Sequence, residues 1–178
     1  MRTKARLLFP ASLCLVLSLL LGACSSSPRK APEKSTSIEQ SAEPKRSARK
    51  TRQARAPVGT RVAGVAETML GVPYVYGGKT PRGFDCSGLV HYAYHQLGID
   101  VPRTAADQLR RSKPIHLRQL EAGDLVFFRH KREPVSHVGI YLGNDQFIHA
   151  PSSGKRVSYG TIGDGYYRDH FYAGGRLH

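Results

Sequence analysis

The chain of 178 residues contains the stretch GFDCSGLV at 83–90, and its Cys86 is the one cysteine beyond residue 24. Asp85, directly before it, is a favourable N-cap residue, which predicts that Cys86 lies in the first turn of a helix. Unpaired N–H groups and the positive end of the helix dipole favour a thiolate there and predict a lowered thiol pKa. Cys86 is therefore a candidate nucleophile, with an inert buried cysteine as the alternative.

A thiolate nucleophile needs a base, and two histidines lie on consecutive predicted strands. His137 begins the alternating stretch HVGIYLG, and His149 lies in the following stretch QFIHA. A three-residue loop at 143–145 would pair Leu142 with Gln146 and make the two histidines diagonal neighbours on one face of the sheet. An even-numbered loop would place them on opposite faces.

This arrangement suits a base, His137, that is oriented by a second polar group, His149. For either histidine alone, a structural hydrogen-bonding role is the simpler interpretation. A zinc site built from Cys86, His137 and His149 is a further alternative, although the sequence has no close ligand pair of the C-x-x-C type. We therefore expect no metal at this site.

The elements that must position these residues follow from the hydrophobic pattern. Three segments have helical spacing of apolar residues, and five later segments alternate as strands do. Helices followed by consecutive strands predict an α+β fold with the N-terminal helices packed on a central antiparallel sheet. The expected helices are 60–70, 86–97 and 104–111, and the expected strands are 124–130, 137–143, 146–150, 156–160 and 172–177.

The first residues are read as a targeting segment and not as part of the fold. Residues 1–23 have a basic start and an apolar run too short to span a membrane. The following LGAC resembles a bacterial lipobox, in which Cys24 is acylated, and an ordinary secretory signal cleaved after Ala23 is the alternative. With Cys14 removed and Cys24 lipidated, Cys86 has no disulfide partner.

Residues 24–57 are expected to be a disordered basic tether, and residues 58–178 the folded domain. The segment 25–57 carries nine Lys and Arg against three Glu, out of a net charge of +14 for the chain, and it has few large apolar groups. The tether could contact anionic lipid headgroups or cell-wall carboxylates, or serve only as a spacer. An exported protein is not expected to bind nucleic acid. Ser25, in place of an aspartate, favours a lipid anchor in the outer membrane facing the periplasm.

Six stretches of the chain together resemble the NlpC family of papain-like cysteine peptidases, which cut peptidoglycan stem peptides. They follow one another in the order of that family, with 51 positions from Cys86 to His137 and 12 from His137 to His149. The six stretches are PYVYGG (73–78), FDCSGLV (84–90), PRTAADQ (102–108), GDLVFF (123–128), SHVGIYLG (136–143) and FIHAP (147–151).

The resemblance implies a papain-like fold and a catalytic set of Cys86, His137 and His149. It implies that the hydroxyl of Tyr74, together with the backbone N–H of Cys86, stabilises the oxyanion. It also implies that three further residues line the substrate groove, although the first could be only a helix cap and the third only a surface charge. These three are Asp85, Ser87 and Arg103.

The reaction implied is hydrolysis through a thioester, without a cofactor, of the bond between γ-D-glutamate and a diamino acid, or of the crosslink to that diamino acid. An acyltransferase or amidase with the same residues, and a non-catalytic wall-binding lipoprotein, are the alternatives. The expected partners are peptidoglycan, the membrane through Cys24, and an adaptor or protease that restrains the enzyme.

Overall fold

The computed structural model describes residues 56–129 and 134–178. The predicted signal peptide at 1–23, the predicted lipidation site Cys24 and the tether up to residue 55 lie outside the described residues. The described residues belong to one compact unit. Within 56–129 and 134–178, no helix has the length and apolar character needed to cross a bilayer.

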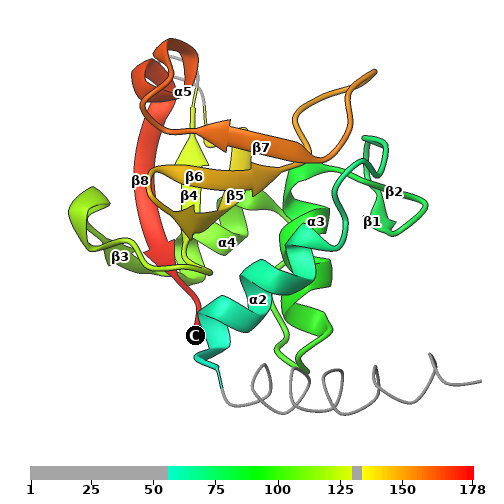
Figure 1. The fold of residues 1–178 in the computed structure, drawn as a ribbon, viewed down its shortest axis with the longest axis horizontal. Helices are drawn as coiled ribbons and strands as arrows, with labels where there is room; N and C mark the ends of the chain where they lie inside the picture. The colour runs from blue at the N-terminus through cyan, green and yellow to red at the C-terminus, as the bar shows by residue number, and fades with distance from the viewer. Residues whose placement is uncertain (1–55, 130–133) are drawn as a thin grey trace, which may run out of the picture. The chain divides into compact units, whose positions relative to one another are not determined.

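The centre of the fold is a six-stranded sheet in which every pair of neighbouring strands is antiparallel (Figure 1). The strand order is β3-β8-β4-β5-β6-β7. The strands are β3 (Lys113–Ile115), β4 (Leu125–Phe128), β5 (His137–Gly143), β6 (Gln146–His149), β7 (Ser158–Thr161) and β8 (Phe171–Arg176). Together with the preceding helices, this sheet confirms the predicted α+β fold.

Two helices pack against one face of the sheet. These are α2 (Val58–Glu67) and α3 (Cys86–His95), and α4 (Ala105–Arg111) follows them in the chain. Their apolar positions, among them Val62, Leu89 and Ala93, share one buried cluster with Phe127 and Ile140 of the sheet. The helices predicted at 60–70, 86–97 and 104–111 are confirmed to within a few residues at each end.

The opposite face of the sheet carries a second, smaller apolar cluster. Its members include Phe128 of β4, Tyr141 of β5 and Phe147 of β6. Tyr167 packs on this cluster from α5 (Gly165–His170), a short helix between β7 and β8 that the sequence did not predict. Successive residues of β4 point to opposite faces of the sheet, and each is buried in the apolar cluster on its own face. The sheet is therefore covered on both sides, and α5 caps the side that carries His137.

The remaining elements are short and were also not predicted. A two-stranded sheet of β1 (Lys79–Thr80) and β2 (Gly83–Phe84) leads directly into Asp85 and α3. A single 3-10 turn, η1 (Leu117–Gln119), connects β3 to β4.

The turn between β5 and β6 differs from the expected one. It consists of Asn144 and Asp145 alone, with φ of 50° and 59°, the left-handed conformation that two-residue hairpin turns require. Gly143 therefore pairs with Gln146. The predicted three-residue loop, which would have paired Leu142 with Gln146, is wrong.

A β-bulge next to this turn compensates for the shorter loop. The ladder passes from the pair Tyr141–Phe147 to the pair at the turn and skips Leu142. The extra residue restores the register beyond it, so Ile140 still faces Ile148. An even-numbered turn alone would have separated the two histidines, but turn and bulge together leave them on one face.

Candidate active site

Cys86 is the first residue of α3, as its sequence context predicts. The Asp85 carboxylate caps the helix by accepting the N–H of Gly88 at 2.7 Å. The short β2 strand fixes the direction in which the chain enters the helix. Cys86 is a free cysteine and is partly buried.

The sulfur of Cys86 lies against the start of β5. Its Sγ is 3.9 Å from the carbonyl oxygen of Ser136, and the backbone N–H of Val138 also hydrogen-bonds the thiol. These two residues flank His137 in the chain. The nucleophile candidate therefore lies beside the backbone of the candidate base, although 51 positions separate them.

The predicted lowering of the thiol pKa is wrong. Burial of the sulfur raises the pKa of Cys86 above its ordinary value, and the neighbouring Asp85 carboxylate raises it further. Hydrogen bonds from backbone N–H groups, including that of Val138, act in the opposite direction but do not outweigh burial. The resting side chain at neutral pH is accordingly a thiol and not a thiolate.

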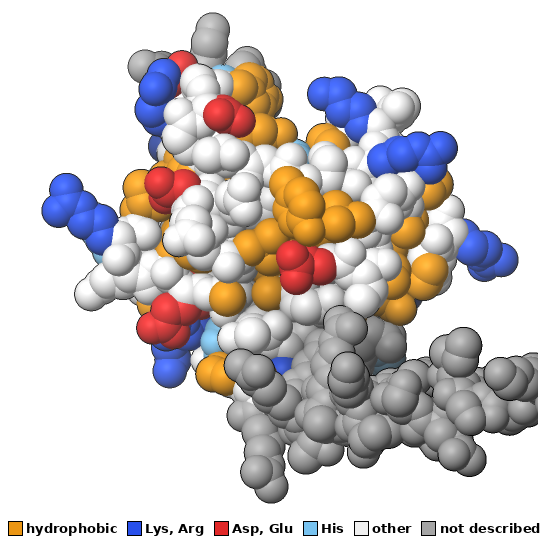
Figure 2. All heavy atoms as spheres, viewed as in Figure 1, with side chains coloured by type: hydrophobic (Ala, Val, Ile, Leu, Met, Phe, Trp, Pro, Cys, Tyr) orange, Lys and Arg blue, Asp and Glu red, His pale blue; other side chains and the backbone are white. Residues whose placement is uncertain are grey.

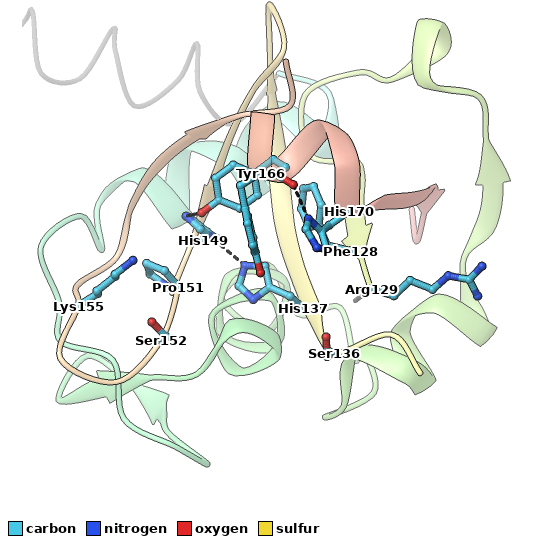
Figure 3. Close-up of a pocket in the computed structure, with 11 residues that line it drawn as sticks. Phe128, Arg129, Ser136, His137, His149, Pro151, Ser152, Lys155, Tyr166 and His170 are labelled. Carbon is cyan, nitrogen blue, oxygen red and sulfur yellow. Dashed lines mark hydrogen bonds between the residues drawn. The ribbon is translucent and has the colours of Figure 1, made fainter. Parts of the chain in front are cut away.

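The two histidines meet, as the predicted register requires. Nε2 of His137 lies 2.6 Å from Nδ1 of His149, and the ring planes are nearly perpendicular at 76°. The close-up in Figure 3 shows this contact as a dashed line between β5 and β6. Because Nε2 of His137 is occupied in this way, Nδ1 is the nitrogen left to accept a proton.

Aromatic rings surround the two imidazoles. Phe128 lies 5.9 Å from His137 between ring centroids, while Phe147 and Tyr167 lie 4.9 Å and 5.4 Å from His149. Burial lowers the pKa of His137 to about 4 and that of His149 to about 3. The pair is therefore neutral at pH 7, and His137 is available as a base.

The sequence did not reveal the part that Tyr167 plays. Its hydroxyl lies 3.3 Å from Nε2 of His149, on the side of that ring opposite His137. For His137 to accept a proton at Nδ1, its own proton must be on Nε2 and be donated to His149. The proton of His149 then lies on its Nε2 and is donated to Tyr167, so this hydroxyl stabilises the tautomer that a base needs.

The predicted groove residues Asp85, Ser87 and Arg103 form one hydrogen-bonded cluster. Both terminal nitrogens of Arg103 donate to Asp85, at 2.9 Å and 2.6 Å, and one also donates to the Ser87 hydroxyl at 3.0 Å. Burial alone would raise the pKa of Asp85, but the hydrogen bonds from Arg103 and from the N–H of Gly88 lower it below its usual value. Asp85 is thus both a helix cap and one half of a largely buried ion pair.

Tyr74 lies close to Cys86, the candidate nucleophile. Burial raises the pKa of its hydroxyl, and the neighbouring Cys86 and Asp85 raise it further. Its backbone N–H donates to the carbonyl of Lys155 at 2.9 Å. The segment that carries Tyr74 is thereby joined to the loop between β6 and β7.

A cavity of about 480 Å³ opens beside the histidine pair. Its walls include Ser136, His137, His149, Ser152 and Lys155, and α5 closes one side (Figure 3). Cys86 is not among its lining residues. The cavity therefore lies beside the candidate base, and at Ser136 it reaches a residue that contacts the Cys86 sulfur.

Other features of the described chain bear on the alternatives. Within 56–129 and 134–178, no group of three His, Cys, Asp or Glu side chains is arranged to hold a metal ion. On the face shown in Figure 2, the Lys and Arg side chains stand apart from one another, and several acidic side chains lie on the same face. That face carries no continuous basic stripe of the kind that follows a nucleic-acid backbone.

Comparisons with known proteins agree with this geometry. The sequence profile of the NlpC/P60 family matches residues 71–176. The chain is 44% identical over 113 residues to murein DD-endopeptidase MepH of Escherichia coli, which covers 61% of this chain and 42% of that protein. It is 43% identical over 110 residues to the bifunctional muramidase/DL-endopeptidase CwlT of Bacillus subtilis. That match covers 60% of this chain and 33% of CwlT. The matched part spans less than half the length of each of these relatives.

The fold is also shared with solved structures. An NlpC/P60 family protein from Bacillus cereus superimposes with a TM-score of 0.65 at 31% identity. The superposition covers 68% of this chain and 40% of that one.

Proposed function

The chain belongs to the NlpC/P60 family, and on that premise we propose that it is a cysteine peptidase that cleaves peptidoglycan stem peptides or their crosslinks. One observation supports this proposal most directly. The Cys86 thiol lies between the backbone groups on either side of His137, whose far nitrogen is bonded to His149. In the proposed mechanism these three side chains serve as the nucleophile, the base and the orienting group that acyl transfer requires.

The proposed first half-reaction starts from a neutral thiol and a neutral imidazole. As Sγ of Cys86 bonds to the substrate carbonyl carbon, the thiol proton passes to Nδ1 of His137. The oxygen of the tetrahedral intermediate is stabilised by the N–H of Cys86 and the hydroxyl of Tyr74. The C–N bond then breaks, His137 returns the proton to the leaving amine, and a thioester remains.

The second half-reaction uses the same residues with water as the nucleophile. Nδ1 of His137 takes a proton from water, whose oxygen attacks the thioester carbonyl. When the C–S bond breaks, the carboxylic acid leaves and the proton returns to the sulfur of Cys86. His149 carries no net charge through the cycle and stabilises the imidazolium of His137 while it exists.

The proposed groove wall on the acyl side is the cluster of Asp85, Ser87 and Arg103. The Asp85 carboxylate accepts hydrogen bonds from the N–H of Gly77 at 3.0 Å, from the N–H of Gly88 and from the guanidinium of Arg103. Such a network favours a rigid wall over a mobile side chain. Its proposed role is to hold the substrate strand across the N-terminus of α3.

The decisive experiment is digestion of purified peptidoglycan followed by mass spectrometry of the muropeptides. The wild-type protein should release shortened peptides that end in a new carboxyl group, and Cys86→Ala should release none. Equal release by Cys86→Ala would refute the peptidase. A product with a new amide or ester in place of the carboxyl group would identify an acyltransferase that uses the same residues.

We also propose that the protein is anchored to the outer membrane through a lipid on Cys24 and faces the periplasm. The support is the LGAC motif at 21–24 followed by Ser25. A flexible tether of about 33 residues would have a reach of roughly 30 Å from the membrane surface. Cys24→Ala should abolish labelling by a fatty-acid analogue and release the protein from the membrane fraction, and retention of the label would refute the anchor.

A further inference from the structure

The cavity beside the histidine pair lies on a defined side of the nucleophile. Cys86 and the Asp85–Arg103 cluster stand at the N-terminus of α3, whereas the cavity begins at Ser136 and His137 and runs toward Lys155. A peptide that passes over Cys86 therefore has one end toward the cluster and the other toward the cavity. At about 480 Å³, the cavity is large enough for one extended amino-acid residue.

The chemistry of the proposed reaction determines which end lies in the cavity. His137 must give its proton to the leaving amine, so that nitrogen must lie within hydrogen-bonding reach of the imidazole. The residue that carries the amine then continues past His137 into the cavity. Both bonds considered above release an amine of the diamino acid, so the diamino acid is the occupant in either case.

The charge of the cavity walls indicates the charge of the group that would bind there. Two of the lining residues, Lys155 and Arg129, are basic, and none of the residues that line the cavity in the described part of the chain is acidic. The guanidinium of Arg129 lies 3.9 Å from the centroid of the Tyr172 ring and extends away from the cavity in Figure 3. Lys155 is thus the cation left to face a ligand.

Lys155 is held in a suitable place by its backbone. Its N–H donates to the carbonyl of Ser152 at 3.1 Å, and its own carbonyl accepts the N–H of Tyr74 at 2.9 Å. In Figure 3 the ammonium group points toward Pro151 and His149. Its positive charge contributes to the lowered pKa of His149, which agrees with this closeness.

We propose that this cavity binds the diamino acid on the leaving-group side of the cut, and that Lys155 pairs with the free carboxylate of that residue. The inference rests on the proposed peptidase function and adds a specificity to it. A diamino acid with a second carboxyl group, such as diaminopimelate, carries this carboxylate, whereas lysine does not. The protein therefore prefers stem peptides whose diamino acid keeps its second carboxylate.

The test compares two crosslinked muropeptides that differ in one group, the second carboxylate of the diamino acid or the corresponding amide. Wild-type kcat/KM should be about fivefold higher for the carboxylate, the effect of one partly exposed ion pair. In Lys155→Gln the ratio of the two kcat/KM values should fall to about one. In Lys155→Glu the preference should reverse.

The matched control is Lys113→Gln, which removes the same charge from an exposed position on β3, the strand at the opposite edge of the sheet from β7. It should keep the wild-type preference. An equal preference in wild type and Lys155→Gln would overturn the inference while the peptidase function stands. Absence of cleavage of both substrates by the wild type would overturn the proposed function itself. A urea-unfolding curve that matches the wild-type curve shows that a Lys155 variant is folded.

Discussion

Nε2 of His149 lies 3.3 Å from the hydroxyl oxygen of Tyr167, while Nδ1 of the same ring lies 2.6 Å from His137. The ring is thus hydrogen-bonded on both sides, and its outer partner belongs to α5. A ring held in this way has little freedom to turn, and the position of its proton follows from its two partners. The geometry of the proposed base therefore depends on a helix that carries none of the three proposed catalytic residues.

Replacing Tyr167 by Phe should lower kcat/KM about fivefold, the effect of losing one hydrogen bond of about 1 kcal/mol. The aromatic ring remains, so the packing against Phe128 and Phe147 is kept. Steady-state kinetics at several pH values should also show a displaced acid limb, because the tautomer of His149 is no longer fixed. Tyr159→Phe removes a hydroxyl bonded only at the surface, to Glu67, and serves as the control. Identical rates and pH profiles in the two variants would contradict this role.

Activity should persist into unusually acidic conditions. His137 must be neutral to accept the thiol proton, and burial lowers its pKa to about 4. The rate should therefore fall only as the pH approaches 4. At alkaline pH the rate should fall only above the ordinary pKa range of a thiol. The raised pKa of Cys86 keeps the thiol protonated up to that pH, and this proton is the one that His137 later passes to the leaving amine. A profile of kcat/KM from pH 3 to 11 measures both limbs, and an acid limb near 6.5 would contradict a buried neutral base.

Unfolding should show a strong pH dependence that originates in the histidine pair. The folded-state pKa of His149, about 3, lies below its unfolded value of about 6.5. Between these values the unfolded chain binds more protons, so stability is complete above pH 6.5 and is lost as the pH falls. Each buried imidazole adds up to about 1.4 kcal/mol per pH unit.

The variant His149→Asn removes one of these titrations and can still hydrogen-bond His137. Its free energy of unfolding, measured with urea between pH 4.5 and 6, should vary with a slope about 1.4 kcal/mol per pH unit smaller than that of the wild type. A slope equal to the wild-type slope would show that His149 is protonated in the folded protein.

Replacing Arg103 by Gln should destabilise the fold by about 2 kcal/mol. The Asp85 side chain is only 12% exposed and loses its paired cation in this variant. The estimate lies below the value for a fully buried pair because the Arg103 side chain is 33% exposed. Urea unfolding at pH 7 measures the loss. Arg110→Gln, which removes an exposed pair with Asp107 on α4, should change stability by less than about 0.5 kcal/mol.

Local sequence rules predicted the position of Cys86 well. Asp85 is a strong N-cap, and a capped helix start depends on neighbouring residues alone. The same holds for the alternation of β5 and for the antiparallel class of the sheet. These features need no knowledge of contacts between distant segments.

The hairpin shows a correct conclusion reached through a wrong detail. The predicted loop at 143–145 has one residue too many, and the skipped Leu142 supplies the residue that the two-residue turn lacks. His137 and His149 share one face when an odd number of unpaired residues connects their strands. The three-residue loop and the two-residue turn with its one-residue bulge both meet this condition. The sequence pattern could not distinguish them because glycine is common in turns and in bulges.

Other features depend on packing between distant segments. The raised pKa of Cys86 comes from the sheet that buries its sulfur, so a rule based on the helix N-terminus alone predicts the wrong sign. Tyr167 lies in GYYRDH, a helix of six residues that is too short to show periodicity. Lys155 lies in a loop, where no pattern indicates the direction of a side chain.

The backbone that joins Tyr74 to the β6–β7 loop has a mechanical consequence. Three main-chain hydrogen bonds, of 2.8–2.9 Å, tie the residues from Gly71 to Tyr74 to those from Lys155 to Val157. The segment that carries Tyr74 and the loop that carries Lys155 are therefore joined and cannot move apart independently. We therefore expect a substrate strand to bind in a groove whose shape is already set in the folded protein.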